Sequence, residues 1–307
     1  MRPRAVPYQA YAAVALAACA WGTWGLVIRR TDAIGPMPTA LESTLVMGVI
    51  TLVSGVTSLR DRIPRRASWK ARAWVAWLGV SDAMNVLLFF AAYKLTIAVS
   101  VLTHYLTPVF VALAAPVVLR ERMTRPTALA IATSFGGLAV MLAPSSQAAG
   151  SSAVWTSAAF GAGSAVFYAS NVLVNKFVAA EFSTSETMFW HGVVGTPVLA
   201  AFVPHDAWAA VDPRAAAFLS LATLGPGALA GLAFVWGLRR IPAAHASTLT
   251  LLEPLVSILL GAALLGERLG ARAAVGAALI LLGAVVVMRA TSSTPPSAPA
   301  TSLPTRR

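Results

Sequence analysis

Charged residues are scarce in this chain: Asp, Glu, Lys and Arg make up 11% of its 307 residues, whereas hydrophobic residues make up 58%. A soluble globular domain carries about 25% charged residues. The mean hydropathy of +0.74 points in the same direction. The chain therefore lacks the polar surface that a water-soluble fold requires, and a soluble globular protein is excluded.

Cysteine occurs once, at Cys19, so no intrachain disulfide can form. Leu16–Cys19 resembles the end of a lipoprotein signal, but apolar residues continue to Ile28, which favours a first membrane helix. The chain also has no P-loop for ATP, no HExxH zinc motif, no Cys/His cluster and no GxSxG nucleophile motif. We therefore expect no cofactor, no metal, no catalytic residue and no enzymatic activity.

Long apolar segments are abundant instead. A helix needs roughly 20 mostly apolar residues to cross a hydrocarbon layer of ~30 Å. The sequence predicts an all-α polytopic membrane protein with ten transmembrane helices. The ten segments are 8–28, 37–59, 73–93, 95–119, 126–143, 153–175, 186–204, 215–238, 242–265 and 271–288.

The distribution of Lys and Arg between the loops predicts the orientation. If the N-terminus is cytoplasmic, 17 of the 23 Lys and Arg residues fall on the cytoplasmic side and 6 on the other side. This bias follows the positive-inside rule and places both termini in the cytoplasm. The formal net charge of +12 therefore reflects membrane topology, and we expect a lipid bilayer, not a nucleic acid, as the surrounding partner.

The two halves of the chain resemble each other at a shift of 146 residues, with eleven identities between 98–140 and 244–286. This predicts a five-helix repeat at 8–143, a linker at 144–152, a second repeat at 153–290 and a disordered cytoplasmic tail at 291–307. Because five is odd, the second repeat enters the membrane from the opposite side. Such inverted repeats are typical of secondary transporters, whose substrate site lies near the membrane midplane.

One pattern is common to both halves: Pro108 and Pro254 are each followed, after twelve residues, by Glu-Arg, at Glu121-Arg122 and Glu267-Arg268. With WGTWG at 21–25 and FFAAYK at 89–94, it resembles the EamA-type branch of the drug/metabolite transporter superfamily. The resemblance implies a ten-helix carrier of the bacterial inner membrane, often an exporter of amino acids or other metabolites. The family often has an arginine early in the second span, where this chain has Glu42, so the resemblance does not imply an anionic substrate.

Ionisable residues deep in the predicted spans are the candidates for the site. Asp82 lies ten residues past Arg72, about 15 Å into its helix, and His104 and Glu253 lie at similar depth. An acid at the bilayer centre costs ~2.5–3.5 kcal/mol, and such residues usually line an ion or substrate path. The structural alternatives are an Asp82–His104 pair or a carboxyl that burial keeps protonated. We expect Glu42 to be shallower, and His191 to be an ordinary packed histidine.

A proline lies close to two of these candidates in the sequence. Pro108 and Pro254 lack a backbone N–H and so free the carbonyls of His104 and Thr250, which is tolerated in a membrane where the backbone lines a cavity.

Charged residues also occur at the ends of the predicted spans. We expect four of them to be helix-end anchors: Glu121, Arg122, Glu267 and Arg268. The expected substrate-binding or coupling residues are Asp82, Asn85, His104, Glu253, Thr107, Thr250, Trp24 and Glu42.

The sequence thus favours a secondary transporter that exports a small organic metabolite, amino-acid-like or related, by alternating access. Proton coupling through Asp82 or Glu253 and uncoupled facilitated export are both compatible with it. An importer and a multidrug efflux carrier of the same fold are alternatives within transport, and a membrane-embedded enzyme or a scaffold are alternatives outside it. The sequence is compatible with a homodimer as well as with a monomer.

Overall fold

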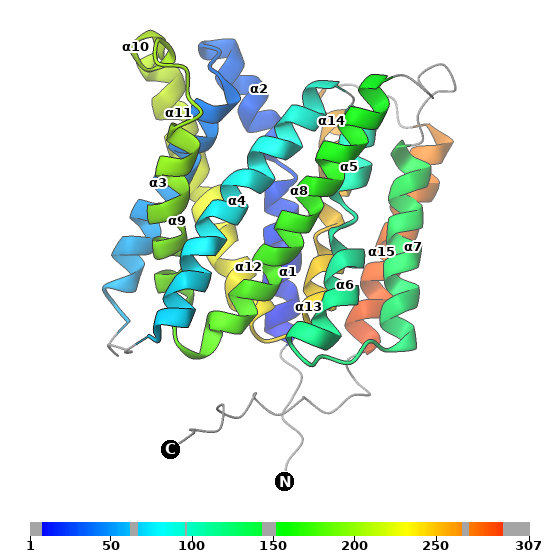
Figure 1. The fold of residues 1–307 in the computed structure, drawn as a ribbon. Coiled ribbons are helices and arrows are strands. Elements are labelled where there is room, and N and C mark those ends of the chain that lie inside the picture. The colour runs from blue at the N-terminus through cyan, green and yellow to red at the C-terminus, as the bar shows by residue number, and fades with distance from the viewer. Residues whose placement is uncertain (1–7, 62–66, 96, 143–151, 266–269, 291–307) are drawn as a thin grey trace, which may run out of the picture.

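The computed structural model describes residues 8–61, 67–95, 97–142, 152–265 and 270–290. Over these ranges the chain forms helices and no strands (Figure 1). The predicted linker, apart from Ser152, and the predicted tail at 291–307 lie outside the described residues, as do Glu267 and Arg268.

The helices of the first half include two interrupted pairs. α1 and α2 are separated at residues 22–23, and α5 and α6 at residues 105–106. The bounds are α1 (Tyr8–Trp21), α2 (Trp24–Ile34), α3 (Thr39–Ser58), α4 (Trp69–Leu95), α5 (Ile97–His104), α6 (Thr107–Val118) and α7 (Arg125–Leu142).

The second half has its own interruptions, a π-helical turn (η3) before α12 and a break at residues 250–251. The bounds are α8 (Ser152–Phe177), η2 (Val178–Ala180), α9 (Thr184–Ala200), α10 (Ala207–Ala210), α11 (Pro213–Thr223), η3 (Leu224–Leu229), α12 (Ala230–Leu238), α13 (Ala243–Leu249), α14 (Leu252–Leu265) and α15 (Ala271–Ala290).

Helix length and surface composition identify a multi-pass membrane protein. Within the described ranges, nine helical stretches are long and apolar enough to cross a membrane, and α9, with 17 residues, is shorter than all of them. Large apolar side chains such as Leu113, Val117 and Leu221 are 69–82% exposed. A soluble monomer rarely exposes so much apolar surface, whereas lipid tails cover it without cost.

The positions of the helices repeat along the chain. α8, α9, α11, α13, α14 and α15 each begin within two residues of the position 146 further along from the start of α1, α3, α4, α5, α6 and α7, respectively. The breaks at 105–106 and 250–251 fall at nearly the same place in this repeat. The shift that relates the two halves in sequence therefore also relates their helices.

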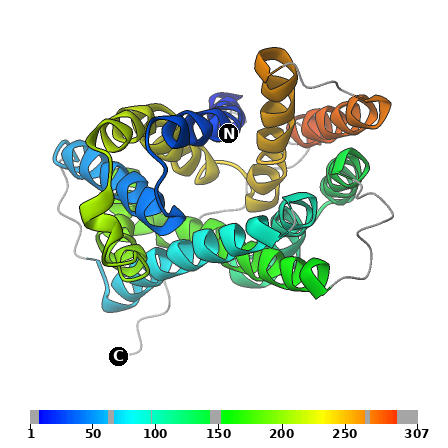
Figure 2. The ribbon, with the colours of Figure 1, turned by 90° about the horizontal axis from the view of Figure 1, so that it is seen from above.

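Counterpart helices pack side by side and antiparallel, α3 with α9 at one edge of the bundle and α7 with α15 at the other (Figure 2). Gly137 of α7 lies against Gly276, near the start of α15, whereas Ala130 lies against Gly283, further along it. A Cβ atom at Gly137 would lie 2.7 Å from the Gly276 carbonyl oxygen. Small residues therefore allow α7 and α15 to approach closely.

We predict that Gly137→Leu destabilises this helix pair, because the new side chain would meet the backbone of α15 and overpacking costs about 1–3 kcal/mol. Thermal unfolding of the purified protein in detergent measures the effect. Gly136→Leu is the matched control, since a Cβ atom there meets nothing within 4 Å. Equal melting temperatures for the two variants would contradict the close approach.

Candidate functional site

The helix breaks at Pro108 and Pro254 leave backbone carbonyls that other groups then satisfy. The freed carbonyl oxygen of His104 accepts a hydrogen bond from Thr107 Oγ1 at 2.8 Å. The freed carbonyl oxygen of Thr250 accepts one from the Glu253 backbone N–H at 3.0 Å. The breaks at 105–106 and 250–251 lie just ahead of the two prolines, and Thr107 and Glu253 fall in the first turns of α6 and α14.

A third break, between α1 and α2, lies against the break in α14. A Cβ atom at Gly22 would be 2.7 Å from both the Glu253 carbonyl oxygen and the Val256 Cβ atom. Only glycine permits this approach without displacing α14. Trp24, the first residue of α2, is half-buried just beyond the contact. Its neighbour Trp21 packs on Phe234 of α12, with 4.8 Å between the ring centroids.

Asp82, near the middle of α4, is held by two side chains of the second half. Asn171 Nδ2 of α8 donates to Asp82 Oδ1 at 2.9 Å, and His191 Nε2 of α9 lies 3.0 Å from Asp82 Oδ2. The Asp82 side chain is 25% exposed, and that of His191 is 8% exposed. The Asp82–His104 pair considered from the sequence does not form. His191 is the ion-pair partner instead, because α4 and α9 pack together.

His104 ends α5 and lies in a second buried network with α4 and α8. Its Nδ1 atom is 2.8 Å from Ser164 Oγ, and Ser164 Oγ is also 2.8 Å from Asn85 Oδ1. The imidazole stacks on the Tyr168 ring at 5.4 Å with an interplanar angle of 12°. His104 and Asn85 are thus brought together, as expected for residues of one site.

Glu253 lies at the level of these networks, and neutral hydroxyl groups surround it. The Tyr105 hydroxyl donates a hydrogen bond to the Glu253 carboxylate. Tyr168 hydrogen-bonds the Thr250 side chain and is within electrostatic range of both Glu253 and Asp82. Tyr168 therefore lies near both acids, and the group as a whole comes from α4, α5, α8, α9 and α14 and from the breaks at 105–106 and 250–251. We name it the central polar group: Asp82, Asn85, His104, Tyr105, Ser164, Tyr168, Asn171, His191, Thr250 and Glu253.

Sequence reasoning missed Tyr105, Ser164, Tyr168 and Asn171. One signal was available for three of them: Ser164, Tyr168, Asn171 and Asn175 follow one another at steps of four, three and four residues. That spacing places them on one face of a helix, and such a polar face within an apolar span indicates an interior position.

Glu42 occupies a different place from the other acids. It lies in the first turn of α3, near one end of that helix, and is 6% exposed. A carboxylate in the first turn of a helix is favoured by the helix dipole. Within the part of the chain that the structure describes, no group of three or more His, Cys, Asp or Glu side chains could hold a metal ion.

A family model places this arrangement among known proteins. The model of the EamA-like transporter family matches residues 9–143 and again residues 155–289. The chain belongs to the EamA-like transporter family. The two matched segments are again related by a shift of 146 residues.

Two further comparisons report similar proteins. A protein of Archaeoglobus fulgidus named "Uncharacterized transporter" is 28% identical over 215 residues, which cover 69% of this chain and 75% of that protein. A protein of known crystal structure matches 91% of this chain and 98% of its own, with a TM-score of 0.72 and 21% identity. The second likeness concerns the fold alone.

This EamA-like transporter has a further set of polar contacts at the end of the bundle where α1 begins and α15 ends, which we call the terminal face (Figure 1). Arg120, with φ of +57°, closes α6 in a left-handed conformation, and Glu121 follows it. Glu121 accepts from the Ala243 backbone N–H at 2.7 Å and forms an ion pair with Lys176 of α8. Lys176 also donates to the Ile241 carbonyl oxygen at 2.5 Å. Glu121 therefore joins the two halves, whereas Arg122 is exposed.

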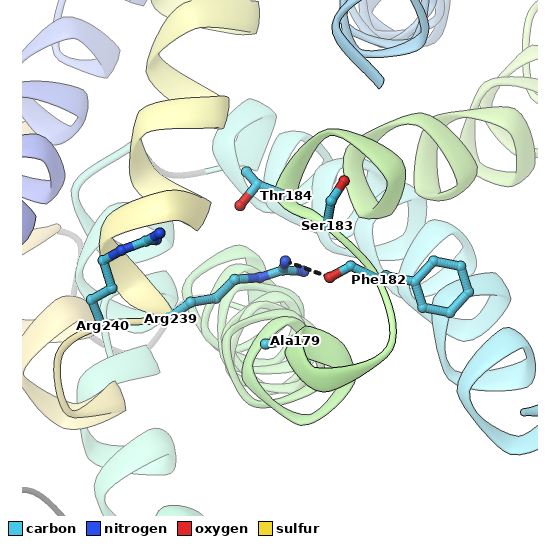
Figure 3. A pocket seen from close by; sticks show the side chains of 6 residues that line it. All are labelled: Ala179, Phe182, Ser183, Thr184, Arg239 and Arg240. Carbon is cyan, nitrogen blue, oxygen red and sulfur yellow. Dashed lines mark hydrogen bonds between the residues drawn. The ribbon is translucent and has the colours of Figure 1, made fainter. Parts of the chain in front are cut away.

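Loops of both halves also meet at the terminal face. Glu181 accepts from the Ser68 backbone N–H at 2.6 Å, and Ser183 donates to Asp61. Arg239 reaches from the end of α12 to the Phe182 carbonyl oxygen at 2.9 Å (Figure 3). A surface hollow of about 420 Å³ lies beside it. Its lining comprises Ala179, Phe182, Ser183, Thr184, Arg239 and Arg240 (Figure 3). This hollow shares no residue with the central polar group.

We predict that Glu121→Ala lowers stability, because it leaves Lys176 without its carboxylate. Removing one partner of a buried ion pair costs about 3–5 kcal/mol; these side chains keep 14–16% exposure, so we expect a loss below that range. The melting temperature in detergent measures it. Arg122→Ala, at the exposed neighbour, is the control and should leave the melting temperature unchanged. A similar fall in both variants would contradict an anchoring role specific to Glu121.

Proposed function

We propose that this EamA-like protein is a secondary carrier that exports a small organic metabolite across the bacterial cytoplasmic membrane by alternating access. The observation that carries the proposal is the central polar group, in which side chains of both halves meet beside three helix breaks. Buried polar groups within a membrane bundle usually mark a substrate or ion path. Export, not import, follows from the resemblance to family members that release metabolites.

The proposed architecture has ten spans in two inverted five-helix repeats, with α9 as the seventh span. The antiparallel packing of the counterpart pairs α3–α9 and α7–α15 supports inversion, because parallel repeats would orient counterparts alike. In inverted-repeat carriers the substrate site lies near the midplane between the repeats. The proposal assigns that position to the central polar group.

The terminal face contacts suggest which side is closed in this conformation. Under the positive-inside orientation, the terminal face is cytoplasmic. The Glu121–Lys176 pair and the Ser68–Glu181 hydrogen bonds would then close the cytoplasmic side. An export cycle requires these contacts to separate so that the metabolite can enter from the cytoplasm. The opposite movement would then release it outside.

We also propose that the two acids link transport to protons. Asp82 and His191 form a pair whose charge depends on protonation, and Glu253 lies among groups that carry no charge in their neutral forms. A carboxyl that exchanges a proton as it faces each side in turn would couple the proton gradient to export.

Two predictions follow from this proposal, and the first concerns export itself. Cells that express the protein should release one class of compound into the medium, and the double variant Asp82→Asn/Glu253→Gln should lose at least about nine tenths of that release at equal membrane abundance. Untargeted metabolomics of the medium measures it. The control is Asp32→Asn/Asp206→Asn, which also replaces two carboxylates by amides, at two exposed acids. If the media of the unmodified protein and the double variant match, export through this site is wrong.

The second prediction concerns coupling. In liposomes that contain the purified protein, an imposed pH gradient should drive uptake of the exported compound. Glu253→Gln or Asp82→Asn should abolish the uptake that the pH gradient drives. A slower exchange of the compound that does not depend on the gradient should remain. A pH profile of exchange that is identical in all three proteins would show that neither acid carries the coupling proton.

A further inference from the structure

We infer that the exported metabolite is an organic cation, an amine with an apolar or aromatic body, whose ammonium group binds at Glu253. This inference deepens the proposed function and rests on it. The contact between the Glu253 carboxylate, the Tyr105 hydroxyl and the neighbouring Tyr168 is its starting point.

The first argument is the balance of charge at the level of the central polar group. The central polar group holds two acids, Asp82 and Glu253, and no Lys or Arg. Lys176 and Arg239 are already engaged. Lys176 pairs with Glu121, and Arg239 donates to the Phe182 carbonyl oxygen and to Thr187 Oγ1, the latter at 2.6 Å. An anionic substrate would meet no free countercharge there, whereas a cation would meet carboxylate.

The second argument is the kind of hydrogen-bonding group left unused. Asn171 Oδ1 and Asn175 Oδ1 are buried and have no hydrogen-bond partner among the described residues. Their orientation follows from their amide nitrogens, which donate to Asp82 Oδ1 and to the Asn171 carbonyl oxygen, respectively. Buried acceptors without partners are costly, so these two amide oxygens favour a substrate that carries hydrogen-bond donors.

The third argument distinguishes the two acids. Asp82 has both carboxylate oxygens engaged, one by Asn171 and one by His191, which can carry the compensating charge. The Glu253 carboxylate accepts a hydrogen bond from the Tyr105 hydroxyl, which is a neutral donor. Glu253 is therefore the acid whose charge is still uncompensated, and the one that a cation would pair with.

The fourth argument concerns the rest of the substrate. Tyr105, Tyr168, His104 and Phe89 form a contiguous set of rings, with centroid distances of 4.6 Å from His104 to Phe89 and 5.1 Å from His104 to Tyr105. Tyr168 and Phe89 are partly exposed within the bundle. Aromatic faces bind both apolar groups and cations, so this wall suits an amine that carries an apolar or aromatic part.

The test measures binding and not only transport. Phenethylamine, 2-phenylethanol and phenylacetate have a similar size and shape and differ in charge, and butylamine replaces the ring by an aliphatic chain. Isothermal titration calorimetry on the purified full-length protein at pH 7 should show at least tenfold tighter binding of phenethylamine than of the alcohol or the acid. Glu253→Gln should weaken phenethylamine at least tenfold and leave the alcohol unchanged. Asp32→Asn, a carboxylate-to-amide change at an exposed acid, should preserve the tenfold preference.

Phenylacetate that binds as tightly as phenethylamine would overturn the inference. So would a preference for phenethylamine that survives Glu253→Gln, or binding of phenethylamine no tighter than that of 2-phenylethanol. Parallel flux measurements of radiolabelled phenethylamine in liposomes separate this inference from the proposed function. Selective binding without flux would support the organic-cation site and contradict transport. Export of an anionic or neutral compound, without selective amine binding, would support transport and contradict the organic-cation site.

Discussion

The arrangement of this protein depends on one constraint: inside a bilayer, every backbone N–H and C=O group needs a hydrogen-bond partner within the protein. Continuous helices meet that requirement by themselves, and most of the described chain consists of them. Interruptions are tolerated only where other groups can take over. Nearby groups supply hydrogen-bond partners at the breaks at 22–23, 105–106 and 250–251. The Thr107 hydroxyl, for example, donates to the His104 carbonyl oxygen. The requirement therefore concentrates polar side chains where the helices are broken.

The same constraint explains why much of the fold could be predicted from the sequence. Each of the ten apolar segments coincides with a helix or an interrupted helix, because segment length and hydropathy are local properties of the chain. The two prolines predicted freed carbonyls at His104 and Thr250, and the breaks near residues 105 and 250 lie next to these two residues. The 146-residue shift predicted that these features occur twice, and the family model matches both halves at that same shift.

The contacts within the site could be predicted only in part. Asp82, His104 and Glu253 stand out because charge or polarity at depth is visible in a single sequence. The partner of Asp82 is 109 residues away, at His191, and the register between α4 and α9 decides which side chains meet. Tyr105 and Tyr168 look like ordinary packing residues until the breaks bring their hydroxyl groups to Glu253 and Thr250. Pairings of this kind depend on helix packing, which no local pattern specifies.

The two halves share their breaks but not their polar side chains, and this difference makes one site out of two similar repeats. At a shift of 146 residues, Glu253 corresponds to Thr107, and Asp82 corresponds to Ala228 in the π-helical turn. Tyr168 and Asn171 correspond to Gly22 and Gly25. Gly22 lets the break between α1 and α2 approach the Glu253 backbone, where a larger residue would displace α14.

At the corresponding place in the second half, α8 presents Tyr168 and Asn171 toward the same acids. One half thus supplies close backbone packing and the other supplies the ring and the amide. A symmetric pair of sites would place twice the number of acids in the bilayer, each at a cost of ~2.5–3.5 kcal/mol. An inverted repeat needs only its helix geometry to be similar in both halves for alternating access. The side chains of the two halves are therefore free to diverge, and a single set of ionisable groups can serve both conformations.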